Sequence, residues 1–174
     1  MADDADRLYG LGLHEFVPER DALAKALRAD GRREEADAVR ALRKPTTAAW
    51  AVNQVVRTQR KGVRELLAAG DALRRAQAAL LGAKGKGRGR ADKLRQATER
   101  ERAAVDALVE AARGLLDRDG HELSAATLDR VADTLRAAAL EDEARAAVCD
   151  GRLVRELRYA GLGLDAPNVP RSAL

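Results

Sequence analysis

The chain is poor in aromatic residues and in proline, and each shortage narrows the fold. Of its 174 residues only four are aromatic and four are proline, and no proline lies between Thr46 and Ala166. Alternating β-branched runs bounded by turn residues, which indicate strands, are absent. Alanine, leucine and arginine, which favour helices most strongly, are abundant instead. The sequence therefore predicts an all-α protein.

Cysteine and long apolar segments are also nearly missing. Cys149 is the only cysteine, which excludes an intramolecular disulfide and fits a reducing compartment. The acidic first ten residues lack the apolar core of a secretion signal, and no apolar run is long enough to span a bilayer. We expect a cytoplasmic protein without a membrane partner, associated with the nucleoid if it binds DNA.

Side chains suited to catalysis or metal binding are scarce. His14 and His121 are isolated, and neither has a second metal ligand at helical spacing. Cys149 has no nearby histidine, so a buried, inert thiol is the expected state. No pair of acidic residues has the surroundings that general acid–base catalysis needs. We expect a protein that is not an enzyme and holds neither a metal nor a cofactor.

Positive charge is concentrated in the middle of the chain. The net charge is only +4, but residues 38–102 carry 17 basic and 5 acidic side chains, whereas the remainder carries 15 and 23. Arginine outnumbers lysine 26 to 6, as GC-rich coding would produce, but such coding does not explain why acids avoid one segment. This asymmetry indicates an anionic partner.

Helical periodicity predicts a long antiparallel hairpin over residues 46–118. Valine and leucine follow helical spacing over residues 47–81, which is about 52 Å of helix at 1.5 Å per residue. A second helix should occupy residues 90–117, and the glycine-rich segment 82–89 should form the tip between the two helices.

Shorter helices should pack at the base of this hairpin. Residues 1–45 contain signals for short helices, the last of which is broken at Lys44 and Pro45, because Pro45 disfavours the helical conformation at Lys44. Residues 119–160 have the periodicity of further short helices, and residues 161–174 should form a loose tail. We expect these parts to fold as one cooperative unit.

Residues 43–64 hold the only tryptophan and a run of cations with no acid among them. On a single continuous helix, the valines of this segment fall on one side, and the tryptophan, amides and cations fall on the other. Cations along one face, together with an aromatic ring and amides, are suited to phosphates and bases. The nucleic-acid-binding residues predicted here are Arg43, Lys44, Trp50, Asn53, Gln54, Arg57, Arg60, Lys61 and Arg64.

Two alternatives apply to this segment. Trp50 is expected either to pack against the N-terminal helices, which is the preferred interpretation, or to stack on bases. The break at Lys44 and Pro45 also fits a helix-turn-helix in which the helix from Thr46 onward reads bases. Against that motif, proline replaces the usual glycine and the predicted helix is too long.

The predicted tip alternates cations with glycine. Glycine leaves the backbone free to follow a polyanion, and such contacts would reach phosphates without reading the base sequence. A solvated loop is the alternative, because glycine and lysine are ordinary in loops. The predicted binding residues of the tip are Lys84, Lys86, Arg88 and Arg90.

Two segments resemble a family of helical proteins from high-GC actinobacteria. The first covers residues 8–57 and includes "RKPTTAAWAVNQVVR", and the second covers residues 123–157 and includes "TLDRVADTLRAAALEDEARAAV". Together they make up about half of the chain. The family has no established activity, so the resemblance implies an all-helical fold and nothing catalytic.

These observations favour a non-enzymatic protein that binds nucleic acid, DNA rather than RNA, through phosphate contacts. The alternative is a helical interaction module without nucleic-acid binding. Long amphipathic hairpins form homodimers readily, and the acidic ends of one copy could meet the basic middle of another.

Overall fold

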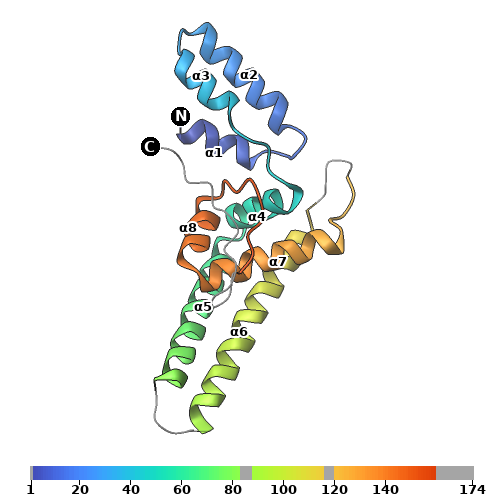
Figure 1. Cartoon of the computed structure of the whole chain (residues 1–174). Helices are drawn as coiled ribbons and strands as arrows, with labels where there is room; N and C mark the ends of the chain where they lie inside the picture. The colour runs from blue at the N-terminus through green and yellow to red at the C-terminus, as the bar shows by residue number, and fades with distance from the viewer. Residues whose placement is uncertain (1, 83–87, 116–119, 160–174) are drawn as a thin grey trace.

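The computed structural model describes residues 2–82, 88–115 and 120–159, and over these ranges it contains eight α-helices and no strand (Figure 1). The prediction of an all-α fold is confirmed for this part of the chain. The tail expected over residues 161–174 lies outside the described residues. The helices are α1 (Ala2–Gly10), α2 (Phe16–Ala29), α3 (Arg33–Arg40), α4 (Thr47–Thr58), α5 (Arg60–Leu81), α6 (Arg88–Arg113), α7 (Ala125–Leu140) and α8 (Asp142–Asp150).

The helices α5 and α6 run side by side as an antiparallel pair that projects away from the other helices (Figure 1). Each buries an apolar stripe at helical spacing, such as Val63 and Leu66 in α5 and Val105 and Leu108 in α6. The base of the pair is covered by α4 and α7. At Gly70 the backbone of α7 comes so close that an added Cβ would lie 2.1 Å from the carbonyl oxygen of Ala139.

The single helix predicted over residues 47–81 is divided in the structure. Gln59 has φ −106° and ψ 43°, outside the helical region, and it separates α4 from α5. The chain turns here because α4 lies within the core, whereas α5 leaves it (Figure 1). The helical projection therefore fails beyond Gln59, and the cations of α5 do not continue the face that carries Trp50. The second long helix also differs slightly, since α6 ends at Arg113.

Buried apolar side chains form two clusters. The larger one contains residues from each of the helices α4, α5, α6, α7 and α8, and it includes Val52, Leu66 and Leu135. The smaller one holds α1, α2 and α3 together around Phe16, and the centroids of the Phe16 and Tyr9 rings are 5.0 Å apart. The three N-terminal helices thus form a separate layer, the head, at the end opposite to the tip of the hairpin (Figure 1).

Residues 151–157, the C-terminal strap, cross the core after α8. Gly151 has φ 68°, a left-handed conformation that favours glycine and ends α8. Two fully buried polar side chains then hold the strap. Asn53 of α4 pairs with the backbone of Leu153, and the Thr134 hydroxyl of α7 accepts a hydrogen bond from the Leu157 N–H at 3.0 Å.

Candidate nucleic-acid interface

Trp50 and Asn53 lie inside the protein. Trp50 is 6% exposed, and its Nε1 donates a hydrogen bond to the carbonyl oxygen of Leu11 at 2.9 Å. Asn53 has no exposed surface. The packing interpretation of Trp50 is therefore confirmed, and the expectation that these two side chains stack on or contact bases is corrected, because the head and the strap cover them.

Gln54 and Arg57 also have partners within the chain. Gln54 Nε2 donates to the carbonyl oxygen of Tyr9 at 3.2 Å. The Arg57 guanidinium donates to both carboxylate oxygens of Asp6, at 2.7 and 2.9 Å, and to the Gly151 carbonyl at 3.1 Å. The hydrogen bonds that Arg57 donates to Asp6 lower the pKa of the Asp6 carboxyl group. Both side chains connect α4 to neighbouring segments, which leaves them little capacity for an external ligand.

The helix-turn-helix interpretation is not supported by the position of α4. Seven of its twelve residues are buried, and it packs against α1, α5, α6, α7 and α8. A recognition helix needs one free face along its length to enter a groove of DNA. Thr46 begins α4 as an N-cap, and its hydroxyl accepts a hydrogen bond from the Ala49 N–H, but the helix then enters the core.

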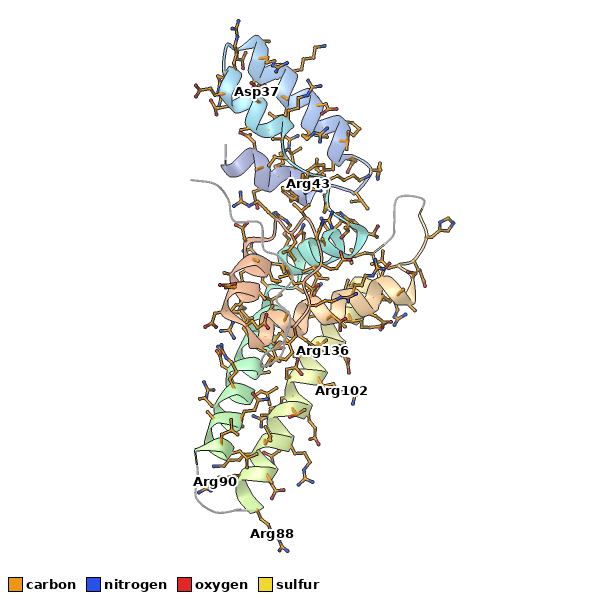
Figure 2. All side chains as sticks on the ribbon, viewed as in Figure 1. Asp37, Arg43, Arg88, Arg90, Arg102 and Arg136 are labelled. Atoms are coloured by element: carbon orange, nitrogen blue, oxygen red, sulfur yellow. The ribbon has the colours of Figure 1, made fainter. Side chains whose placement is uncertain are left out.

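The other predicted residues are exposed but are not brought together. Arg43 and Lys44 precede α4, beside the head, whereas Arg88 and Arg90 lie at the far end of the hairpin (Figure 2). The first turns of α5 carry the rest, Arg60, Lys61 and Arg64, which are exposed; Lys61 lies 3.7 Å from Glu65 in a surface ion pair. Lys84 and Lys86 lie outside the described residues.

A groove of about 290 Å³ lies between α5 and α6 in the half of the hairpin that projects from the core. The small side chains of Ala72, Ala76 and Ala79 in α5 and of Ala97 in α6 leave this space open. Cations and one amide form the rest of its lining, and no carboxylate takes part. These polar residues are Arg75, Arg90, Lys93, Gln96 and Arg100.

Three of the groove cations have no partner among the described residues. Arg75, Lys93 and Arg100 are exposed, and none forms a hydrogen bond or ion pair with another described residue. The neighbouring Arg74 differs, because it donates to Asp71 and to Asp142, each at 2.7 Å. The groove therefore offers charges that no carboxylate in the described part of the chain neutralises by direct contact.

The acids nearest to the groove are largely occupied. Asp71 accepts hydrogen bonds from Arg74 and Arg145, which lower its pKa to about 2. Asp92 forms an ion pair with Arg95. Residues 72–82 and 88–100, which we call the distal hairpin, contain seven basic and two acidic side chains. This excess makes the distal hairpin a positively charged projection of the molecule.

Sequence reasoning missed Arg75, Lys93 and Arg100 because each looks like an ordinary solvent-exposed cation on a helix. A signal was present in the alanines at positions 72, 76 and 79, which follow helical spacing on one face of α5. A stripe of such small side chains opposite another helix leaves space that larger apolar residues would fill.

Other kinds of site find little support in the part of the chain that the structure describes. No group of three or more histidine, cysteine, aspartate or glutamate side chains is arranged to hold a metal ion there. None of its helices is long and apolar enough to cross a membrane. Cys149 is exposed, which corrects the expectation of a buried thiol.

Comparisons with protein-family models, with curated proteins and with solved structures each returned no match.

Proposed function

We propose that the protein is a non-enzymatic nucleic-acid-binding protein that contacts phosphates through the distal hairpin, with DNA as its preferred partner. The observation that carries the proposal is the groove between α5 and α6, where Arg75, Lys93 and Arg100 have no partner among the described residues and no carboxylate lines the groove. Unpaired arginine and lysine side chains on one projecting element are suited to phosphates, which they bind without reading sequence.

The position of these cations adds to the argument. Arg88 begins α6 and extends beyond the end of the hairpin, while Arg90 lines the groove (Figure 2). The distal hairpin projects away from the core, so a rod-like polyanion could approach it without meeting the head. Association with the nucleoid would follow from binding of this kind.

The alternative is a helical interaction module without nucleic-acid binding, and one form of it, pairing of two copies through their distal hairpins, is less favoured by the charges. In that arrangement two surfaces with seven basic and two acidic residues each would be brought together. Like charges placed opposite each other weaken an interface. An anionic partner has no such penalty.

Fluorescence anisotropy tests the proposal. Labelled duplex DNA, single-stranded DNA and RNA of equal length would be titrated with the protein at salt concentrations between about 50 and 200 mM. We expect the tightest binding to duplex DNA, with a slope of log affinity against log salt of about −4 or steeper, as contact with roughly five phosphates requires. Absence of binding to all three probes at about 100 mM salt would contradict the proposal.

A further inference from the structure

Exposed apolar side chains gather at the end of the hairpin. Leu66, Leu73 and Leu80 are seven residues apart on α5; the first two are 1% and 5% exposed, whereas Leu80 is 42% exposed. Leu81, the last residue of α5, is 82% exposed. Among the described residues only Tyr159 is a further exposed large apolar side chain. Two of the three therefore lie at the point of the molecule farthest from its core.

The charges around these leucines limit what can cover them. Arg88 begins α6 at the end of the hairpin that is remote from the core (Figure 2), and Arg75 and Lys93 line the groove between α5 and α6. A second copy that placed its own distal hairpin there would bring an equally basic surface to the same place. A complementary partner must carry negative charges for the cations and, next to them, apolar surface for the leucines. A nucleic-acid duplex has this construction, because phosphates flank a stack of bases.

We propose that Leu80 and Leu81 act as an apolar wedge that enters a base step of duplex DNA and bends it. This inference rests on the proposed function, since the groove cations must first hold the phosphates on either side. Leucine is among the side chains that minor-groove proteins insert between base pairs. Insertion disrupts the stacking of the base step and kinks the duplex by about 20–90°.

The wedge also predicts where binding is tightest. Pyrimidine–purine steps such as TA and CA unstack more readily than others, and a mismatch is already partly unstacked. Cations that touch only phosphates would not distinguish these duplexes. We expect a preference of about threefold to tenfold for a duplex with a central mismatch over its perfect counterpart, which corresponds to part of the unstacking cost.

A bending assay tests the wedge. A duplex of about 30 base pairs labelled at both ends for energy transfer would be titrated with the wild type and with the double variant Leu80→Gln, Leu81→Gln. Glutamine has nearly the helix propensity of leucine, and both positions are exposed, so the fold should persist; circular dichroism and thermal unfolding check this. We expect the wild type to shorten the end-to-end distance, and the variant to bind within about threefold of wild-type affinity without bending.

Three results would overturn the wedge. In one, the wild type binds duplex DNA without bending it, so that phosphate binding stands and the wedge fails. In another, the glutamine variant bends DNA as the wild type does. In the third, no duplex binds, so the proposed function and the wedge fail together. A membrane also has an anionic, partly apolar surface, so vesicles of anionic phospholipid are titrated as well. If the wild type binds these vesicles but no duplex, and the glutamine variant does not bind them, the leucines contact a membrane surface and the wedge is wrong.

Discussion

Asn53 and Leu153 exchange two hydrogen bonds although they are 100 residues apart in the sequence. Asn53 Nδ2 donates to the Leu153 carbonyl at 3.0 Å, and the Leu153 N–H donates to Asn53 Oδ1 at 2.9 Å. The buried amide thus satisfies both backbone groups of a strap residue that forms no regular secondary structure. The face of α4 that the sequence suggested for nucleic acid holds the fold together instead.

Replacement of Asn53 by alanine should destabilise the protein strongly. Asn53→Ala leaves the buried N–H and carbonyl of Leu153 without partners, and each unsatisfied group costs about 1–3 kcal/mol. We expect the free energy of unfolding to fall by about 2–5 kcal/mol, measured by urea denaturation followed by circular dichroism. The control is Gln77→Ala, which removes an exposed amide side chain from α5. Equal denaturation midpoints for the two variants would contradict the structural role of Asn53.

The close approach of α5 and α7 at Gly70 gives a second prediction. A Cβ at this position would lie 2.1 Å from Ala139 O and 2.7 Å from Ala139 C, and since both are backbone atoms, the helices must separate. Gly70→Ala should therefore lower the free energy of unfolding by roughly 2–3 kcal/mol.

Gly89→Ala provides a control of the opposite sign for Gly70→Ala. Gly89 lies within α6, and apart from its chain neighbours and the nearby backbone of its own helix, nothing lies within 4 Å of a Cβ added there. Alanine is a better helix former than glycine, so this variant should gain up to about 1 kcal/mol. Thermal unfolding of both variants separates two explanations. If close packing matters at Gly70, only Gly70→Ala lowers the melting temperature; if the protein tolerates no glycine replacement, both variants lower it.

Glu101 should make stability depend on pH in an unusual direction. It is 7% exposed among the buried residues of α6, and its Oε1 is buried without a hydrogen-bond partner. Burial raises its pKa, a shift that Arg136 opposes and Asp106 reinforces. Because the folded state holds this proton more tightly than the unfolded state, the stabilisation is complete below the ordinary pKa of 4.5 and is lost as pH rises through the folded-state pKa.

The variant Glu101→Gln stays neutral and tests this dependence. Near pH 4 it should be about as stable as the wild type, whereas at pH 7 it should be more stable by about 1 kcal/mol or more, since the wild type then buries an unpaired charge. Urea denaturation at several pH values measures the difference. Glu99→Gln removes an exposed carboxylate from the same helix and should show no such trend; parallel trends in the two variants would rule out a special role for Glu101.

Much of the fold could be predicted from local signals. Pro45 lies beyond the N-terminal helices, although α3 already ends at Arg40, and Gly82 follows the end of α5. Leucine and valine spacing reveals α5 and α6. The break at Gln59 could not be predicted in this way, because no proline or glycine marks it. Tertiary packing decides it, since α4 must remain within the core while α5 extends from it.

The candidate site was only partly predictable for a related reason. A helical projection assigns polar side chains to solvent, but the head and the strap cover Trp50, Asn53 and Arg57 and supply their hydrogen-bond partners. Contacts between residues so distant in sequence leave no periodic trace. The positive charge of the distal hairpin, in contrast, depends on composition alone and could therefore be predicted from the sequence.

The most direct test of the account compares two triple variants that remove the same charge from different places. One neutralises the unpaired groove cations, and the other neutralises three exposed cations of the head that likewise have no ion pair with a described residue. The groove variant is Arg75→Gln, Lys93→Gln and Arg100→Gln, and the head variant is Lys25→Gln, Arg33→Gln and Arg40→Gln.

Anisotropy titrations of duplex DNA with both variants, over the same range of salt, decide the matter. We expect the groove variant to lose about tenfold or more in affinity and its salt slope to become shallower by about 3, as the loss of three phosphate contacts requires. The head variant should bind as the wild type does. Equal losses in the two variants would show that net charge alone drives binding and would contradict the groove as the contact surface.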